Sequence, residues 1–170
     1  MNNPFDFFQL NASLSIDLKQ LRLQFLQIQR NAHPDFGDNQ TSASENANIY
    51  YEILKEPSSR LKCLIETFSD LSLNLNLLDQ DFLMEMMDLN DEIEEATNGN
   101  DSKRLSAENQ LNDLKLELDD SMISLTEKWE SGEFSIKNPA QDQWSEHVLW
   151  YQKYKYWLRL RKNLDGVEEM

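Results

Sequence analysis

The stretch NAHPDFGDNQ, residues 31–40, interrupts a chain that is otherwise rich in helix-forming residues. Before it lies the segment SIDLKQLRLQFLQIQRNA, residues 15–32, whose apolar residues recur at steps of three and four: Leu18, Leu21, Phe25 and Ile28. This spacing predicts a helix with one buried stripe. The helix must stop at His33, because Pro34 has no N–H group and disfavours helical geometry in the residue before it. The sequence therefore predicts a helix and then a polar turn that carries His33, Pro34 and Asp35.

Three more helices are predicted around this one. The segment SASENANIYYEILKEP, residues 42–57, begins with a serine able to cap it and ends at Pro57. Its apolar stripe consists of Ala47, Tyr50 or Tyr51, and Leu54. A shorter helix, residues 58–68, carries Leu61, Leu64, Ile65 and Phe68, and a small one is expected at residues 4–10. The two longer helices would form an antiparallel hairpin that buries its apolar seam.

The composition favours an all-α chain. Glycine and proline, which break helices, number only four each in 170 residues. No apolar run reaches the ~20 residues that a transmembrane helix needs, and the N-terminal residues do not read as a targeting segment. The single cysteine, Cys63, excludes an internal disulfide and suits a reducing cytosol. A formal net charge of −15 argues against binding to nucleic acid or to an anionic membrane.

The charge is distributed unevenly, and this predicts two modules. Residues 1–68 hold eight acidic and six basic residues, whereas residues 69–170 hold twenty-three acidic and ten basic ones. We therefore place the boundary near TFSDLSLNLN, residues 67–76, and divide the chain into domains 1–70 and 71–170. The first domain contains the helical hairpin, and the second is the strongly acidic one.

Three amphipathic helices are predicted in the second domain. The first runs from about Asp79 to Thr97, with the stripe Leu78, Phe82, Met86, Leu89 and Ile93. The second covers residues 102–132, with near-heptad spacing of Leu111, Leu114, Leu118, Met122, Leu125 and Trp129. The third covers residues 138–164, with Trp144, Val148, Tyr151 and Leu158 on one side and Tyr156 and Leu160 towards another. Short links between them predict a three-helix bundle, in which His147 is a structural or surface histidine.

The turn of His33, Pro34 and Asp35 admits three chemical interpretations. Metal binding needs three or four converging ligands, and the only other histidine is His147, while Cys63 stands alone. Acid–base catalysis needs a substrate pocket, and the chain has no nucleophile motif and no glycine-rich phosphate loop. Docking on another protein fits better, because proline fixes the turn and Asp35 can accept a bidentate hydrogen bond from a partner arginine.

Two further surfaces have both a purely structural and a functional interpretation. The helix before the turn displays three charged residues, all of them basic: Lys19, Arg22 and Arg30. They form either an ordinary solvated helix face or a face that docks on a partner. The helix at residues 79–97 has three apolar residues beyond its stripe: Leu83, Met84 and Met87. They indicate either burial on two sides or an exposed patch, since methionine adapts its shape to partner surfaces. Between Asp79 and Asp101 the chain holds nine acidic residues and no base.

The first domain resembles a J-domain, the part of a co-chaperone that docks on a DnaK-type ATPase. Besides the His-Pro-Asp turn after a basic helix, five residues at steps of three are similar to the N-x-x-Y-x-x-L-x-x-P-x-x-R run that closes many J-domains: Asn48, Tyr51, Leu54, Pro57 and Arg60. Two positions depart from the pattern. Phe36 stands where most J-domains have lysine, and Ala32 where many have tyrosine, which can alter partner choice.

With its second domain the chain resembles the HscB-type (Jac-type) co-chaperones of iron–sulfur cluster assembly. The segment DFLMEMMDLNDEIEEA, residues 81–96, is similar to the F-L-M-E-x-x-E-L-x-E-E-L run that begins the family's second domain. The segment YKYWLRL, residues 154–160, is similar to one near the family's end. The resemblance implies a non-enzymatic protein without cofactors. It would bring an IscU-type iron–sulfur scaffold to an HscA-type DnaK chaperone and stimulate that chaperone's ATPase.

The resemblance also implies binding residues. His33, Pro34, Asp35 and the basic face would bind the chaperone. The scaffold would bind a face of apolar, acidic and aromatic positions, matched here by Leu83, Met84, Met87, Asp88, Asp91, Glu95 and Tyr156. No catalytic residue and no metal site is implied. The chain lacks the paired CxxC motifs of some members, so we expect a bacterial cytoplasmic protein ahead of one in the mitochondrial matrix.

Three other functions stay open. A general J-domain co-chaperone would deliver unfolded clients through its acidic, Met-rich bundle, which would then bind many extended apolar peptides. An inert helical adaptor would carry His-Pro-Asp only as a turn. An enzyme is the weakest alternative, and it would require turnover that is lost in His33→Ala without a chaperone present.

Overall fold

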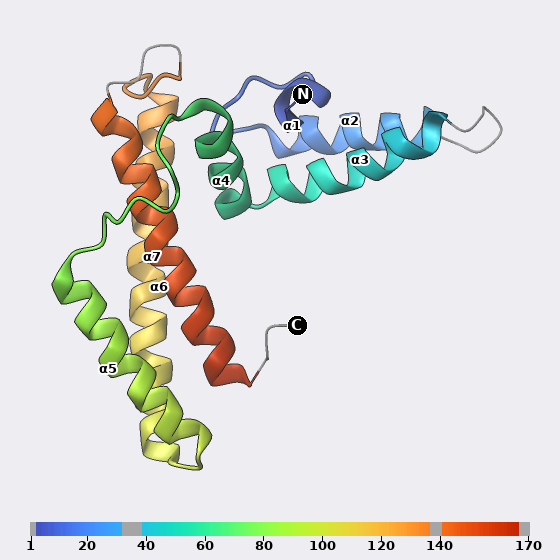
Figure 1. Ribbon diagram of the computed structural model, residues 1–170. Helices are drawn as coiled ribbons and strands as arrows, with labels where there is room; N and C mark the ends of the chain where they lie inside the picture. The colour runs from blue at the N-terminus through green and yellow to red at the C-terminus, as the bar shows by residue number, and fades with distance from the viewer. Residues whose placement is uncertain (1–2, 32–38, 137–140, 167–170) are drawn as a thin grey trace.

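The computed structural model describes residues 3–31, 39–136 and 141–166, and within these ranges the chain is helical without strands (Figure 1). Its helices are α1 Pro4–Phe7, α2 Leu18–Asn31, α3 Asn39–Lys55, α4 Pro57–Phe68, α5 Gln80–Thr97, α6 Asp101–Glu130 and α7 Gln141–Asp165. The predicted all-α fold, a helical hairpin followed by a three-helix bundle, is confirmed. No helix in these described ranges is long and apolar enough to cross a membrane.

Helices α2 and α3 pair antiparallel to form the hairpin, and α1 packs on α3 (Figure 1). Asp17 caps α2, since its Oδ1 accepts hydrogen bonds from the backbone N–H groups of Lys19 (2.8 Å) and Gln20 (3.2 Å). The ring of Phe25 stacks on that of Tyr51, with 4.5 Å between centroids. The seam contains three fully buried residues: Leu21, Ala47 and Leu54. The hairpin is therefore held by the apolar stripes that the sequence indicates.

The prediction of a buried stripe on α2 is wrong for one residue, Leu18, which is 51 % exposed. The stacking of Phe25 on Tyr51 sets the register of the two antiparallel helices. In that register Leu18 lies about one turn beyond Lys55, where α3 ends, so no seam remains to cover it. The open choice between Tyr50 and Tyr51 resolves in favour of both, since Tyr50 packs on an aromatic ring of α1.

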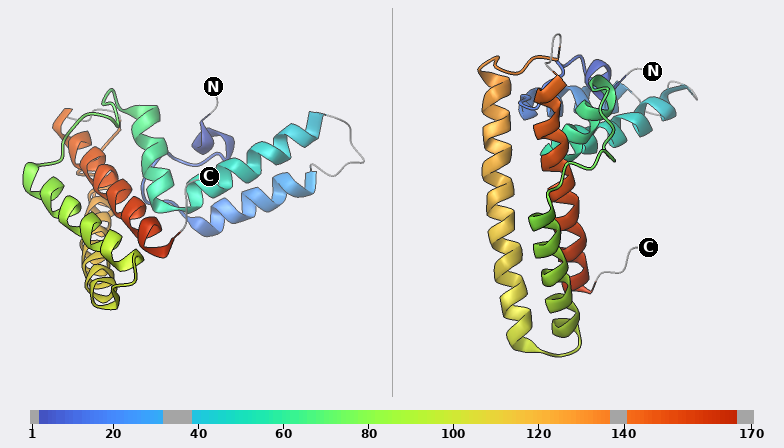
Figure 2. Two further views of the ribbon diagram at one scale, coloured as in Figure 1. Left: turned by 60° about the horizontal axis from the view of Figure 1, so that its bottom comes forward. Right: turned by 60° about the vertical axis from the view of Figure 1, so that its left-hand side comes forward.

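Helices α5, α6 and α7 form the bundle (Figure 2). Asp79 caps α5 by accepting a hydrogen bond from the N–H group of Phe82 at 2.7 Å. The helix ends just before Gly99, whose φ of +100° favours glycine. Four residues of the predicted stripe of α5 are buried: Phe82, Met86, Leu89 and Ile93. The fifth, Leu78, precedes the helix and is half-buried. The four buried residues share one core cluster with Ala107 and Leu111 of α6 and Leu160 and Leu164 of α7.

A second core cluster joins the hairpin to the bundle. It contains Phe5, Leu21 and Leu64 together with Leu125 of α6 and Val148 of α7. Helix α4 lies against α7, and the hairpin projects sideways from this end of the bundle (Figures 1 and 2). The boundary between domains 1–70 and 71–170 stays a prediction, and the apolar core is continuous across it.

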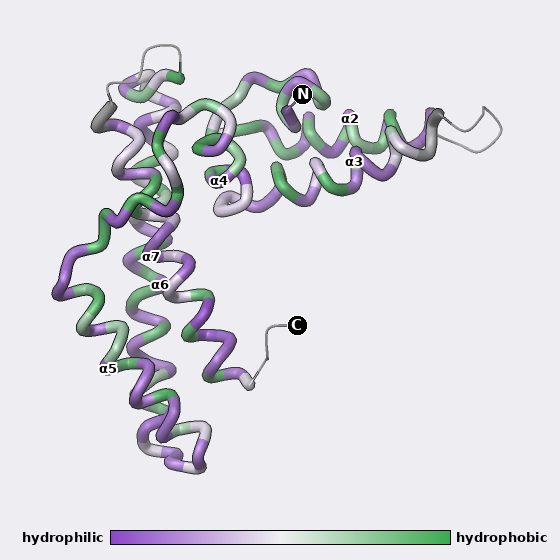
Figure 3. The backbone as a smooth tube through the Cα atoms, viewed as in Figure 1, coloured by the Kyte–Doolittle hydropathy of each residue, from purple (hydrophilic) through white to green (hydrophobic). Residues whose placement is uncertain are grey.

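Helix α7 buries different sides along its length. Trp144 and Val148 are buried as predicted, whereas Tyr151 and Leu158 are only partly buried. Trp150 is buried although the pattern places it outside the stripe. The cause is that α7 contacts α4 and α6 towards its start and α5 and α6 towards its end, so no single stripe suffices. Figure 3 shows the resulting short alternation of hydrophobic and hydrophilic residues along the bundle helices.

Candidate functional site

The apolar residues predicted to bind the scaffold lie on the outer side of α5. Met84 is 63 % exposed and Met87 is 69 % exposed, although both lie in a helix whose opposite side is core. Leu83 is half-buried beside them. Of the two interpretations that the sequence leaves open, burial on two sides is wrong for the methionines. They form an exposed apolar patch, which is typical of an interaction surface.

Three carboxylates continue this patch along α5. Asp88, Asp91 and Glu95 are exposed, and their spacing of three and four residues places them on one side of the helix. None of the three forms an ion pair with a residue that the structure describes. Glu92 differs, because Lys103 of α6 donates to it at 3.1 Å and holds the pKa of the Glu92 carboxyl below its ordinary value. Glu92 therefore serves the α5–α6 contact, whereas the other three face solvent.

A groove between α5 and α7 brings several of these residues together. It has a volume of about 560 Å³ and is lined by Leu83, Met86, Met87, Asn90, Asp91, Tyr156, Arg159 and Asn163. Four of the predicted scaffold-binding residues are among them. Met84, Asp88 and Glu95 do not line the groove and lie on the exposed side of α5 next to it. The structure thus places a groove with four apolar or aromatic lining residues beside a row of carboxylates that form no ion pair with a described residue.

Tyr156 is held at this groove by two aromatic contacts. Its ring meets that of Phe82 edge to face, with 5.9 Å between centroids. The guanidinium carbon of Arg159 lies 4.7 Å from the centroid of the Tyr156 ring, within the range of a cation–π interaction. The sequence reasoning missed Arg159 as a site residue. The sequence does indicate Arg159 by its position three residues after Tyr156, because this spacing places both side chains on one side of α7.

The basic residues predicted to bind a chaperone are exposed on α2. Lys19, Arg22 and Arg30 are three and eight residues apart, so they share one side of the helix. With the residues that the structure describes they form no ion pair. Leu23 and Leu26, which the sequence reasoning missed, lie on the same side and are exposed as well. This face therefore combines positive charge with apolar surface.

His33, Pro34 and Asp35 lie outside the described residues, and their predicted role stays a prediction. The second histidine, His147, is a structural residue, as one of the two expectations had it. It is buried, and burial lowers the pKa of its imidazole. Burial also raises the pKa of the half-buried Cys63 thiol. In the described ranges no three His, Cys, Asp or Glu side chains converge to hold a metal ion.

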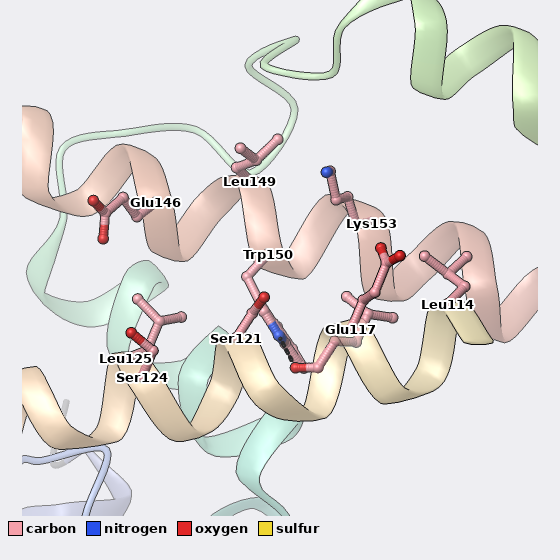
Figure 4. Close-up of a pocket in the computed structure, with 10 residues that line it drawn as sticks. Leu114, Glu117, Ser121, Ser124, Leu125, Glu146, Leu149, Trp150 and Lys153 are labelled. Carbon is pink, nitrogen blue, oxygen red and sulfur yellow. Dashed lines mark hydrogen bonds between the residues drawn. The ribbon is translucent and has the colours of Figure 1, made fainter. Parts of the chain in front are cut away.

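A second groove lies between α6 and α7, nearer the hairpin (Figure 4). It has a volume of about 280 Å³ and contains none of the residues predicted to bind a partner. One of its lining residues is Trp150, whose indole N–H donates to the backbone carbonyl of Leu118 at 2.8 Å, drawn as a dashed line in Figure 4. Figure 4 also shows Glu117 and Lys153 at its rim. We assign it no part in the candidate site.

The helical hairpin and the bundle define a class of all-helical proteins built from two such parts, and the exposed apolar and acidic side of α5 is typical of an interaction surface. Residues 78–165 match the family model described as the HscB C-terminal oligomerisation domain. This match covers more than half of the chain. The chain belongs to the HscB co-chaperone family.

Relatives that match over nearly the whole chain agree with this assignment. A co-chaperone protein HscB homolog of Haemophilus ducreyi is 28 % identical over 180 residues, covering 99 % of this chain and 97 % of the relative. One from Acinetobacter baumannii strain SDF is 29 % identical over 174 residues, covering 98 % and 91 %.

Two solved structures share the fold. The chaperone HscB of Vibrio cholerae matches with a TM-score of 0.64 at 20 % identity, covering 97 % of this chain and 96 % of that one. The human co-chaperone protein HscB matches with a TM-score of 0.70 at 21 % identity, covering 96 % and 81 %. At these identities the two structures bear on the fold alone.

Proposed function

We propose that this protein delivers an IscU-type iron–sulfur scaffold to an HscA-type DnaK chaperone and stimulates the chaperone's ATP hydrolysis, which aids transfer of the cluster and maturation of iron–sulfur proteins. The protein itself carries out no covalent chemistry in this proposal. In the proposal the cluster is cargo of the scaffold, and no cofactor of this protein is required. Membership of a co-chaperone family supports the general role, and the two exposed surfaces are the observations from which we propose the particular one.

The observation that carries the proposal is the groove between α5 and α7. Met87 and Tyr156 line it, and the exposed Met84 lies beside it, so a partner would bury apolar surface that this chain leaves in water. We expect these side chains to supply most of the affinity, because hot spots of interfaces are apolar or aromatic anchors. The carboxylates of α5 would guide a basic partner surface towards the groove.

The chaperone would bind at the other end of the molecule. The basic face of α2, with Lys19, Arg22 and Arg30, would meet a negative surface, and Asp35 would accept hydrogen bonds from a partner arginine. His33 and Pro34 would present that carboxylate. Stimulation of the ATPase requires only that the docked hairpin favours the hydrolysis-competent state of the chaperone.

The joint core cluster gives the two surfaces a common frame. Because α4 and α7 pack together, a scaffold on α5 and a chaperone on α2 would be held on one molecule at the same time. The encounter of the bound scaffold with the bound chaperone then becomes intramolecular, which raises their effective concentration towards each other. Since the whole-length relatives named above are bacterial, we place this function in the bacterial cytoplasm.

An ATPase assay tests the proposal. It uses a DnaK-type chaperone from the same organism, with and without the IscU-type scaffold, and compares the wild type with Asp35→Ala and with Met84→Ala/Met87→Ala. We expect Asp35→Ala to abolish all stimulation. The methionine variant should keep the basal stimulation and lose the additional stimulation that the scaffold produces, with scaffold affinity reduced about tenfold or more.

A matched control is Leu105→Ala/Leu116→Ala, which removes two equally exposed side chains from α6. It should behave like the wild type in both conditions. A methionine variant that responds to scaffold as the wild type does would contradict delivery through α5. If the bundle bound many extended apolar peptides as tightly as the scaffold, general delivery of unfolded clients would replace the proposal.

A further inference from the structure

We infer that the groove between α5 and α7 has a basic edge opposite its acidic one, so that it selects a scaffold segment with an acidic side chain towards α7 and basic side chains towards α5. This inference rests on the proposed function and specifies the partner surface. The basic edge consists of Lys155, Arg159 and Lys162, and the acidic edge of Asp88, Asp91 and Glu95.

The three basic residues share one side of α7. They are spaced by four and three residues, and Lys155 and Arg159 are exposed while Lys162 is half-buried. Together with Tyr156 and Leu158 they line a hollow of about 410 Å³. Arg159 and Tyr156 also line the α5–α7 groove, so the hollow and the groove adjoin. The aromatic ring that anchors the groove is therefore bordered by positive charge.

These charges are not neutralised by ion pairs within the described part of the chain, and the guanidinium of Arg159 lies over the Tyr156 ring. Other basic residues of the bundle form ion pairs with described residues: Lys103 with Glu92, Arg104 with Glu108, Lys115 with Asp119, Lys128 with Glu146, and Arg161 with Asp165. The basic edge has no such pair in the described part of the chain. Lys153 of α7 also lacks an ion pair with a described residue, and its ammonium lies 5.0 Å from the centroid of the Phe82 ring. The basic edge is the place where three such residues share one side of the helix.

Asp91 and Arg159 line the same groove from opposite helices without forming an ion pair with each other. Each charge remains available to a partner, on either side of the apolar floor. A purely basic partner would be attracted by α5 and repelled by α7. A partner with both signs in the matching order would be attracted at both edges, and in the reverse order it would be repelled at both. The arrangement thus fixes the direction in which a partner segment lies.

The charged edges of the groove affect the orientation and the association rate of the scaffold more than its affinity. Pairs at an exposed edge are screened, and each changes binding by less than about fivefold. Reversing two charges replaces attraction by repulsion, so we expect a loss of about three- to tenfold in affinity. The loss should lie mainly in the association rate and should shrink at high salt.

Binding kinetics of the complete protein with the IscU-type scaffold test this inference at 0.05 and 0.5 M salt. Arg159→Glu/Lys162→Glu should weaken binding three- to tenfold at low salt and less at high salt. Arg159→Met/Lys162→Met, which keeps an apolar side chain over Tyr156, should fall between this variant and the wild type. Arg161→Glu is compared with the single variant Arg159→Glu, since each reverses one charge; Arg161 lies on another side of α7, where it pairs with Asp165, and its reversal should have the smaller effect.

The outcomes separate the inference from the proposed function. If charge reversal leaves binding unchanged or strengthens it, the basic edge does not face an acidic side chain, and the inference is overturned. If at the same time Met84→Ala/Met87→Ala still weakens binding, the proposed function stands without it. If the wild type fails to bind the scaffold, both are overturned. If Arg161→Glu lost as much affinity as reversal of a charge of the basic edge, the effect would come from net charge alone. This result would also overturn the inference.

Discussion

The indole nitrogen of Trp129 on α6 lies 2.9 Å from Nε2 of His147 on α7, and it can only donate. Nε2 must therefore be the acceptor, and the imidazole proton lies on Nδ1, 2.8 Å from the carbonyl oxygen of Gln143 to which it donates. Protonation of Nε2 would break the bond to Trp129. His147 is thus built into the bundle as a neutral side chain, next to the rings of Phe134 and Trp144.

This arrangement predicts a pH-dependent stability. Burial is the main cause that lowers the folded-state pKa of His147 below its ordinary value of 6.5; the Gln143 carbonyl and Glu146 oppose the shift, and Lys128 adds to it. The unfolded chain therefore takes up a proton at this residue at a higher pH than the folded chain. Stability contributed by the neutral imidazole is complete above about pH 7.5 and is lost as the pH falls through 6.5.

The check is urea unfolding of the wild type and His147→Gln between pH 5 and 8. A single proton changes the free energy of unfolding by at most about 1.4 kcal/mol per pH unit. We expect the wild type to lose stability relative to the variant as the pH falls, because glutamine has no proton to take up. Parallel curves for the two proteins would contradict a neutral, depressed His147.

Met86 and Met87 provide a comparison between adjacent positions. Met86 is 6 % exposed and lies in the core cluster of the bundle, whereas Met87 is 69 % exposed. We expect Met86→Ala to lower the free energy of unfolding by about 2–5 kcal/mol. Met87→Ala should change it by no more than about 0.5 kcal/mol, because its side chain stays in water in both states. Urea unfolding of the two variants measures both changes. Equal losses of unfolding free energy would argue against an exposed methionine patch.

We expect substitution of Arg60 to lower the free energy of unfolding substantially, although this residue is charged. It is 6 % exposed, and its guanidinium donates to the backbone carbonyls of Leu14, Leu54 (2.7 Å) and Lys55 (3.3 Å). Burial lowers its pKa to about 10, so the group stays charged at neutral pH. Arg60→Ala leaves buried carbonyls without a donor, and we expect a loss of about 2–4 kcal/mol in thermal or urea unfolding.

Arg60→Lys tests the geometry of the same site. A lysine keeps the charge but cannot hold three carbonyls in the plane of a guanidinium, so most of the loss should remain. Arg22→Ala on the exposed side of α2 is the control, and it should change stability by no more than about 0.5 kcal/mol. Full rescue by lysine would mean that charge alone, and not the carbonyl contacts, holds the segment.

The sequence predicts the helices well because their signals are local. Asp79 and Asn98-Gly99 mark the ends of α5, and the spacing of its apolar residues identifies its buried side correctly. The five-residue run that resembles a J-domain also identifies Arg60 as notable. Its structural role escapes the pattern, because the carbonyl of Leu14 that it binds is 46 residues away.

Features that depend on the pairing of helices were missed or misplaced. Trp150 is buried because α7 changes its neighbours along its length, which no single periodicity encodes. Leu18 is exposed because the register of the hairpin leaves it past the end of α3. The sequence singles out Tyr156 and Met87, but only the packing of α5 against α7 shows that they line one groove with Arg159.

Gln152 holds the segment between α4 and α5 in place. Its side-chain oxygen accepts a hydrogen bond from the N–H group of Leu77 at 3.2 Å, and its amide donates to the carbonyls of Leu73 (3.1 Å) and Leu75. One buried side chain of α7 thus ties down the connection that leads into α5. Gln152→Ala should free residues 73–77 and cost about 1–2 kcal/mol of stability, because these backbone groups must then find water.

Hydrogen exchange resolves this effect by position. In Gln152→Ala we expect faster exchange of the Leu77 amide and its neighbours, while the amides of α2 and α6 keep their protection. Gln143→Ala is the matched control, since this glutamine of α7 also donates to a backbone carbonyl, that of Glu133 at 3.3 Å, but lies outside the connection. Faster exchange throughout the bundle in Gln152→Ala would indicate a general loss of packing. Faster exchange confined to residues 73–77 in Gln152→Ala would show that a single side-chain amide holds this connection, and with it the start of α5, in place against α7.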